Sequence, residues 1–317
     1  MLAKNKFLFL VFWVLVTLGS CAQNTKNEEK MITKQQYNNI SKEVKTYDYN
    51  PTYQLKVNTN LCTYEAYIND ILVGFSFTAG RTAGEQNIDI PQYILKTGKQ
   101  SVCFKIYPKA ITKGVLENLV DKNADFRIRI VHGEYYKIKF EDFKEVFRMK
   151  LPKVEHDIPY IELKGEFEAV VPYELEGWSN GMDLSKEDPK KLEEEVLEKY
   201  NQYRTAFESK DVATLATMIY KREKEIAQAY YFVSGQNNSY DNGWEELEQE
   251  CNELKEMKPL ENYEMKISGH GRLVNLLRTD SKYKDFSAVA GSTGKKARFY
   301  GLTLYRPAPG TPLEVIR

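Results

Sequence analysis

The chain has 317 residues, with 45 basic and 45 acidic side chains, so its formal charge at pH 7 is zero. Proteins that bind nucleic acid usually carry a basic face or stripe, and a balanced charge gives no sign of one. Nucleic acid is therefore not among the partners we expect. The three histidines and four cysteines show no spacing typical of a multi-histidine metal site or a zinc cluster, so we predict no metal and no other cofactor.

Residues 1–20 have the layout of an export signal. Lys4 and Lys6 give a positive start, Phe7–Val16 is an unbroken apolar run, and small residues come just before Cys21. The apolar run is too short to cross a bilayer, which takes about 20 apolar residues. The alternatives are an ordinary secretory signal with an incidental cysteine and an uncleaved anchor.

The segment Leu18-Gly19-Ser20-Cys21 resembles the lipobox of bacterial lipoproteins. The resemblance implies cleavage before Cys21 and a diacylglycerol thioether on its sulfur, and several acyl chains such as palmitate make a durable anchor. Ala22 differs from the aspartate of an inner-membrane retention signal, which favours the outer membrane of a Gram-negative source. The periplasmic and cell-surface faces of that membrane both stay open, although Asn27-Glu28-Glu29 resembles the surface-export tethers of one bacterial phylum.

Residues 21–50 are predicted to form a flexible, lipidated tether. The segment is rich in Gln, Asn, Lys, Glu and Thr and has few apolar residues, so it buries too little surface to offset the entropy lost on ordering. A short helix beginning within Ile40–Val44 is the alternative, and it would shorten the reach of the tether.

About 270 residues follow, more than the 100–200 typical of one domain, and two domains are therefore expected. The composition changes near residue 174, where Asn180-Gly181 and Asp188-Pro189 are turn and helix-start signals. We therefore predict a first domain at 51–173, a linker at 174–189 and a second domain at 190–317.

The first domain shows apolar residues that alternate with polar ones in several short runs, a pattern that predicts half-buried strands. Asn69-Asp70 suits a tight turn, and Phe126–Ile130 and Tyr136–Phe140 flank His132-Gly133 as a second hairpin. With a closing strand at Tyr160–Val171 and no long helix, we predict an all-β antiparallel sandwich.

The stretches Tyr67–Pro91 and Leu95–Lys99 resemble accessory sandwich modules of secreted bacterial proteins, whose usual work is binding or spacing. Cys62 and Cys103 lie in the same domain, and an oxidising compartment permits a disulfide between them. The alternation leaves open whether their Cβ vectors meet, and two unpaired half-buried thiols are the alternative.

Helical spacing dominates the first part of the second domain. Asp188-Pro189 predicts a helix start, Asp211 is expected to cap a second helix, and Trp244–Leu254 marks a third. Later apolar residues fall into short strands at Met265–Ile267, Leu273–Leu277 and Ala297–Tyr305. We predict an α+β domain of three helices followed by an antiparallel sheet.

The residues Tyr200, Tyr203 and Phe207, followed by Glu208–Leu215 and Met218–Tyr220, resemble the opening of nuclear transport factor 2-like domains, which have a cystatin-like α+β fold. At the level of element order the resemblance covers residues 191–306, and it implies a sheet that curls around helices to form a conical pocket. The family includes enzymes, binding proteins and assembly modules, so the resemblance does not specify a function.

Aromatic residues of the second domain are the best candidates for ligand binding, because they offer large contact areas with polar tips. The candidates are Tyr230, Tyr231, Tyr240 and Trp244. Helix packing is the competing interpretation for the two that lie on apolar stripes, and residues 236–239 can add hydrogen bonds to a sugar or peptide. His270, between two glycines, is either a base in the pocket or a solvated turn residue.

Three functions are open at this point. We prefer a non-enzymatic lipoprotein, anchored through Cys21, that binds an envelope protein, a peptide or a glycan, and we assign no catalytic residue. The second is a small-molecule enzyme whose C-terminal pocket uses Asp211, His270 or a tyrosine. The third is a structural component of the envelope.

Overall fold

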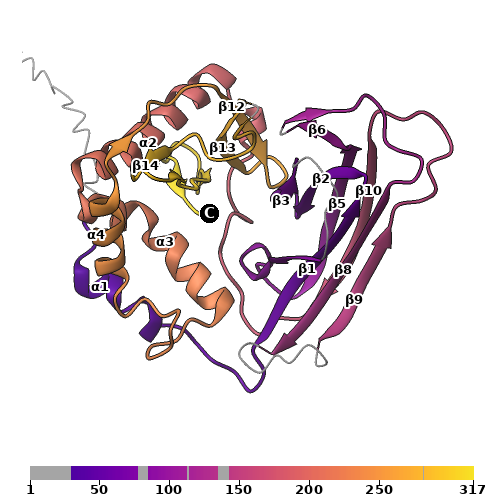
Figure 1. Cartoon of the computed structure of the whole chain (residues 1–317). Helices are drawn as coiled ribbons and strands as arrows, with labels where there is room; N and C mark the ends of the chain where they lie inside the picture. Colours follow the sequence, from indigo (N-terminus) through magenta and orange to yellow (C-terminus); the bar gives the residue numbers. More distant parts are fainter. Residues whose placement is uncertain (1–29, 78–84, 113, 135–142, 281) are drawn as a thin grey trace, which may run out of the picture. The chain divides into compact units, whose positions relative to one another are not determined.

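The computed structural model of the chain describes residues 30–77, 85–112, 114–134, 143–280 and 282–317. The predicted signal at 1–20 and the lipidation site at Cys21 lie outside the described residues. Residues 31–317 form one compact unit, whose described parts are drawn in colour in Figure 1. Within these described ranges, no helix combines the length and the apolar character needed to cross a membrane.

Two four-stranded antiparallel sheets occupy residues 51–169 (Figure 1). The first sheet has the order β4-β1-β8-β9, with strands Gln86–Asp89, Pro51–Asn60, Asp125–Glu134 and Lys144–Lys150. The second has the order β10-β5-β2-β3, with strands Ile161–Ala169, Gly98–Pro108, Cys62–Ile68 and Ile71–Ser76. A short hairpin consists of β6, Ala110–Thr112, and β7, Val115–Leu116.

The strands follow the predicted alternation. Along β5, Phe104 and Ile106 are buried while their neighbours Cys103, Lys105 and Tyr107 are half-buried, as a side-chain period of two requires. Leu55 of β1 and Phe104 of β5 belong to one hydrophobic cluster, so the two sheets share a core. The turn between β2 and β3 lies at Asn69 and Asp70, which both have positive φ (50° and 64°), as a type I′ hairpin turn requires.

The hairpin predicted around His132-Gly133 is wrong. Strand β8 continues through both residues to Glu134, and His132 lies opposite Tyr53 of β1. The segment stays extended because β1 pairs with β8 over its whole length and satisfies its backbone groups. The predicted strand at Tyr136–Phe140 lies outside the described residues.

Cys62 and Cys103 are free thiols, so the structure shows the unpaired alternative and not the possible disulfide between them. They lie on the neighbouring strands β2 and β5, but Cys62 faces Pro108 and Cys103 faces Tyr67. The offset from position 62 to 67 separates them by about 17 Å along the strands, and a disulfide tolerates a Cα separation of only about 7 Å. Burial raises the pKa of the Cys62 thiol to about 11.

Three helices and then several antiparallel strands make up the remainder, as predicted for this part of the chain. The helices are α2 (Pro189–Ser209), α3 (Val212–Tyr230) and α4 (Gly243–Glu253). The strands form sheets of order β11-β14-β15 and β12-β13-β16-β17. In chain order, β11 to β17 span Glu256–Met257, Tyr263–Ser268, Leu273–Arg278, Ala290–Ser292, Ala297–Phe299, Leu304–Tyr305 and Glu314–Val315.

Helix caps and one buried tyrosine explain why these elements hold together. The carboxylates of Asp188 and Asp211 accept hydrogen bonds from the first turns of α2 and α3, at 2.9 and 3.0 Å. Tyr200 on α2 is fully buried. Its hydroxyl donates to the carbonyl of Leu302 and accepts from the N–H of Leu276 at 2.8 Å, so it joins the helix to the strands behind it.

Residues 31–50 are folded, so the prediction of a flexible tether is wrong for this part of the segment 21–50. Helix α1 spans Lys34–Asn38 and a 3-10 turn, η1, spans Ile40–Lys42. Thr33 and Gln36 form a capping box at the start of α1. Tyr37 and Ile40 are buried in the core of the helical region, and this burial stabilises a segment that its polar composition predicted to be unfolded.

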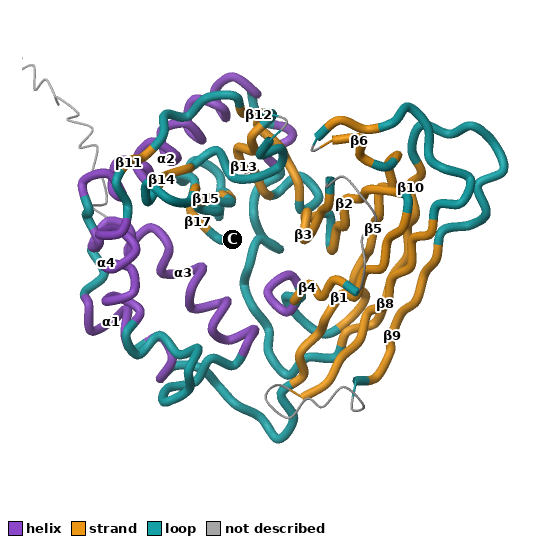
Figure 2. The backbone as a smooth tube through the Cα atoms, in the orientation of Figure 1, coloured by secondary structure: helices purple, strands orange, loops and turns teal. Residues whose placement is uncertain are grey.

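Segment 174–189, predicted as a linker, is mostly loop (Figure 2), with one 3-10 turn, η4, at Leu184–Lys186. Leu175, Trp178 and Leu184 are nevertheless buried, so the segment packs against its surroundings. The division of the chain into two domains stays a prediction, because residues 31–317 form a single compact unit.

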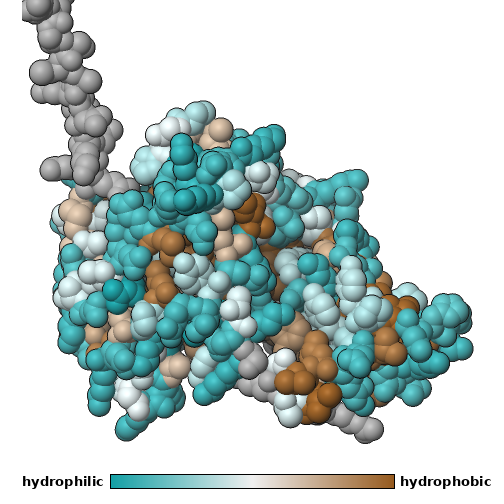
Figure 3. Space-filling view, turned by 90° about the horizontal axis from the view of Figure 1, so that it is seen from above, coloured by the Kyte–Doolittle hydropathy of each residue, from teal (hydrophilic) through white to brown (hydrophobic). Residues whose placement is uncertain are grey.

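Hydrophilic residues dominate the face of the molecule seen in Figure 3, and apolar residues form separate patches on it. Several large apolar side chains are more than a third exposed, among them Ile111, Val115 and Phe286. Exposed apolar residues of this kind are normal on protein surfaces and do not by themselves define a docking face. Cavities lined by aromatic and polar side chains are the better candidates for a site.

Candidate ligand-binding site

A cavity of about 540 Å³ lies among the helices. Its lining comes from α1, the second half of α2, α3, the loop between α3 and α4, α4, and Tyr300, which follows β15. The volume falls in the range of roughly 300–1,000 Å³ that is typical of small-molecule sites.

An ion pair on α3 gives the cavity a polar wall. The guanidinium of Arg222 lies 2.6 Å from the Glu223 carboxylate, and the Tyr240 hydroxyl donates to the other carboxylate oxygen at 2.5 Å. The Arg222 and Glu223 side chains are 15% and 12% exposed. Arg222 also donates to the carbonyl of Gly301 at 3.0 Å, so both charges are fixed in position before any ligand enters.

Tyr37 brings a hydroxyl to the cavity from α1. The side chain is 3% exposed, and in the described ranges no residue makes a hydrogen bond with its hydroxyl. Burial, with the Glu223 carboxylate as the second cause, raises the pKa of Tyr37. The phenol therefore stays protonated and can donate to a ligand.

Aromatic rings form another wall. The Phe207 and Tyr300 rings are stacked with centroids 4.1 Å apart, and the Tyr203 ring meets Phe207 edge-on at 5.1 Å. The Tyr300 hydroxyl donates to Glu250 at 2.6 Å, which fixes the plane of its ring. This wall offers a flat apolar surface beside hydrogen-bonding groups.

The rim of the cavity is polar and acidic. Residues 237–239 of the α3–α4 loop line it together with Glu246 and Glu250 of α4. The Glu246 carboxylate makes no ion pair or hydrogen bond with any described residue. One arginine and three glutamates line the cavity, Arg222 against Glu223, Glu246 and Glu250, so the lining carries an excess of negative charge that disfavours anionic ligands.

The predicted binding residues are not gathered at this cavity. Tyr240 lines it, whereas Trp244 packs beside it with its backbone N–H bonded to Asn38. Tyr231 is buried with the core of the N-terminal sheets, and Tyr230 packs against the same core.

His270 and Asp211, proposed as residues of a pocket enzyme, also lie outside this cavity. His270 lines a different cavity, beside Trp178 and Arg272. Asp211 is the N-cap of α3, where the backbone N–H of Thr214 is the first cause of a lowered pKa. The structure thus gives Asp211 a helix-capping role.

Arg222, Glu223, Tyr37 and Tyr300 were not predicted from the sequence. The run 221–225, Lys-Arg-Glu-Lys-Glu, is typical of a solvated helix face. Segments distant in the sequence cover this face: the Tyr240 hydroxyl donates to Glu223, the Gly301 carbonyl accepts from Arg222, and α1 and α2 line the same cavity. Tyr37 comes one residue after the capping box of α1, and this helix-start signal is the sequence feature that could have pointed to it.

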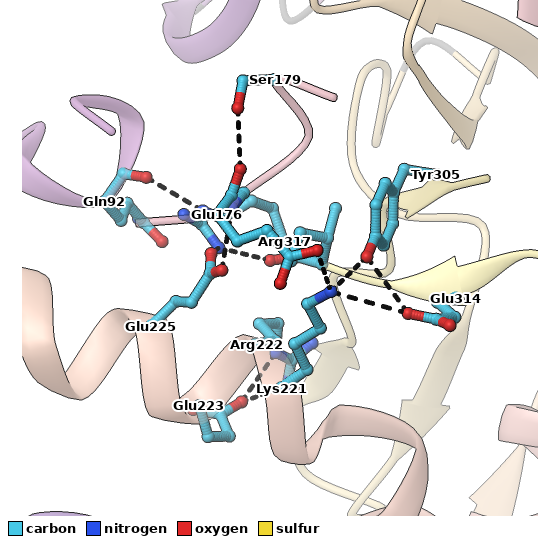
Figure 4. A network of polar contacts seen from close by, with 12 residues as sticks. Gln92, Glu176, Ser179, Lys221, Arg222, Glu223, Glu225, Tyr305, Glu314 and Arg317 are labelled. Carbon is cyan, nitrogen blue, oxygen red and sulfur yellow. Dashed lines mark hydrogen bonds and ion pairs between the residues drawn. The ribbon is translucent and has the colours of Figure 1, made fainter. Parts of the chain in front are cut away.

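A second polar network involves other residues of α3 (Figure 4). Lys221 lies 3.1 Å from the Glu176 carboxylate. Glu225 accepts from the guanidinium of Arg317 at 2.9 Å and from the N–H of Gly177 at 2.8 Å. These contacts join α3 to the segment 174–189 and to the last described residue.

No protein-family model, no curated protein and no solved structure matches this chain. Among the residues that the structure describes, no group of three His, Cys, Asp or Glu side chains is placed to hold a metal ion. The geometry of the cavity is therefore the basis for the function proposed below.

Proposed function

We propose that the chain is a membrane-anchored envelope lipoprotein that binds a small neutral sugar in the cavity among its helices, without catalysing a reaction. The observation that carries the proposal is the fixed Arg222–Glu223 pair facing the same cavity as the Phe207–Tyr300 stack. The anchor is a lipid on Cys21, and the outer membrane is the proposed location.

The chemistry of the cavity fits a sugar better than other small ligands. One face of a sugar ring carries C–H groups that pack on an aromatic ring such as Tyr300, while its hydroxyls need both donors and acceptors. Tyr37 supplies a donor, Glu246 an acceptor without a described partner, and residues 237–239 supply amide and hydroxyl groups. The excess of carboxylates favours a neutral ligand over an anionic one.

We also propose that residues 51–173 form a β-sandwich and that residues 190–317 form a domain like those of nuclear transport factor 2. The shared core of the two N-terminal sheets supports the first part. The order of three helices followed by strands, with a cavity among the helices, supports the second.

A calorimetric titration of the full chain in detergent tests the proposed ligand class. Neutral mono- and disaccharides are titrated into the natural protein and into two variants, Tyr300→Leu, which removes the stacking ring, and Tyr160→Leu, which changes an exposed tyrosine outside the cavity. We expect saturable binding of at least one sugar, weakened at least ten-fold by Tyr300→Leu and unchanged by Tyr160→Leu. No saturable binding, or equal losses in both variants, contradicts the proposal.

A further inference from the structure

A second, smaller cavity of about 260 Å³ lies beside β3 and the β12–β13 pair. Part of its lining is apolar and comes from β3, with Leu72, Val73 and Phe75. Other lining residues are polar, among them Asn275, Asp285 and Arg317. The lining therefore offers both apolar surface and hydrogen-bonding groups.

Each of these three polar residues has a buried atom without a hydrogen-bond partner in the described chain. The atoms are Oδ1 of Asn275, Oδ2 of Asp285 and Nη2 of Arg317. Buried polar groups are nearly always hydrogen-bonded, so each exception calls for an explanation such as a bound molecule. One donor and two acceptors among the lining residues of the same cavity match a ligand that carries both a hydrogen-bond acceptor and donors.

The guanidinium of Arg317 is held by three acceptors that leave its Nη2 atom unused (Figure 4). Nη1 lies 2.9 Å from the Glu225 carboxylate and also donates to the carbonyl of Ile316 at 2.6 Å, while Nε donates to the carbonyl of Gln92 at 2.9 Å. The Trp178 ring lies against the same group, 5.0 Å from its central carbon. A guanidinium held in this way keeps a fixed direction, and a carboxylate is the ligand group that best matches its remaining donor.

Asp285 is unusual in both its backbone and its side chain. Its φ is +65°, a left-handed conformation that costs energy in most residues and is often found at functional sites. Its side chain is fully buried, with Oδ1 2.9 Å from the Lys266 ammonium and Oδ2 3.9 Å from that of Lys284. Lys266 also lines the cavity and is 34% exposed, so the partner of the buried Asp285 carboxylate reaches solvent.

We propose that this cavity binds a free α-amino acid with an apolar side chain. The ligand carboxylate pairs with Nη2 of Arg317, its ammonium pairs with Oδ2 of Asp285 and Oδ1 of Asn275, and its side chain lies along β3. The volume corresponds to about nine water molecules at about 30 Å³ each, enough for a small or medium amino acid. This site is separate from the sugar cavity and does not depend on it.

Titration of the full chain with L-leucine and two blocked analogues tests the two-ended recognition. N-acetyl-L-leucine lacks the ammonium group and L-leucinamide lacks the carboxylate, while both keep the side chain. We expect saturable binding of L-leucine and at least a ten-fold weaker affinity for each analogue. Absence of saturable L-leucine binding at millimolar concentration, or equal affinity for all three compounds, overturns the proposal.

A pair of variants places the binding at this cavity. Asp285→Asn keeps the shape of the side chain and tolerates the left-handed backbone, but it removes the charge that pairs with the ammonium. Glu264→Gln is the matched control, because Glu264 is the other carboxylate partner of Lys266, at 3.0 Å, and does not line the cavity. We expect Asp285→Asn to lower the affinity for L-leucine at least ten-fold and Glu264→Gln to leave it unchanged. Equal affinities in the two variants would contradict binding at this cavity. If Asp285→Asn does not fold, the analogue series with the natural protein decides the question.

Discussion

At the scale of single residues, the pattern of apolar spacing correctly placed Tyr200 on the buried face of a helix. The spacing could not predict that its hydroxyl would join Leu302 to Leu276, because these partners lie 102 and 76 positions away. Arg222 and Glu223 were missed for the same physical reason. Their partial burial depends on segments distant in the sequence, among them the α3–α4 loop and Gly301, and no local pattern reports contacts with distant segments.

Tyr200→Phe should lower the free energy of unfolding without changing the fold. The substitution keeps the ring but leaves the Leu302 carbonyl and the Leu276 N–H without their buried partner, at a cost of about 1–3 kcal/mol. Urea denaturation measures the effect, with Tyr160→Phe as the control because Tyr160 is half exposed. A Tyr200→Phe variant as stable as the control would show that water replaces both hydrogen bonds.

At the scale of secondary structure elements, α1 changes the interpretation of the segment after the predicted signal. The polar composition of residues 21–50 predicted a tether, but α1 binds α4 through Glu245. The Glu245 carboxylate is 2.8 Å from the Lys34 ammonium and accepts from the Asn38 amide at 2.8 Å. Because Tyr37 lies between these residues on the same helix, the contacts that hold α1 also hold Tyr37 in the cavity among the helices.

The elements that were predicted correctly have strong local signals. Asp188-Pro189 and Asp211 begin α2 and α3, and Asn69-Asp70 makes the turn between β2 and β3. The turn at His132-Gly133 was wrong because pairing with β1 overrides a weak local turn signal. Local chemistry thus predicts element starts and tight turns, whereas long-range pairing decides where a strand ends.

The attachment of α1 should depend on pH through Glu245. The hydrogen bond with Lys34 is the largest cause that lowers the pKa of Glu245 from 4.5 to about 2. A lowered pKa in the folded state contributes stability above the unfolded value of 4.5, and this contribution is lost as the pH falls toward 2. Glu245→Gln removes the charge and keeps an acceptor for Asn38.

Urea midpoints of the natural protein and of Glu245→Gln, measured from pH 7 to pH 2, check this expectation. The natural protein should be the more stable of the two at pH 7, and the difference should shrink between pH 4.5 and pH 2. A difference that stays constant over this range would mean that the Lys34–Glu245 pair does not hold α1.

At the scale of the whole molecule, the composition change near residue 174 predicted a boundary but not the contacts that cross it. Ala229 and Tyr231, from the end of α3 and just beyond it, lie in the same hydrophobic cluster as strands β1 and β5. Arg317 reaches the carbonyl of Gln92. Tyr231 is therefore buried in the core, an outcome that depends on how distant elements pack and not on any local pattern.

The proposed membrane attachment through Cys21 also belongs to the scale of the whole molecule. Cys21→Ser removes the sulfur that would carry the lipid, and several acyl chains are what make an anchor durable. Metabolic labelling of cells with a palmitate analogue should mark the natural chain and leave the Cys21→Ser variant unlabelled. Equal labelling of the two chains, or no labelling of the natural chain, would contradict a lipid on Cys21.

The most direct test of the proposed function is a crystal structure of the full chain with the sugar that binds most tightly in the calorimetric panel. The account predicts a sugar ring that lies against Tyr300, with hydroxyls in hydrogen-bond contact with Tyr37 and with the Arg222–Glu223 pair. Density for the sugar outside this cavity, or a cavity that stays free of sugar at saturating concentration, would contradict it.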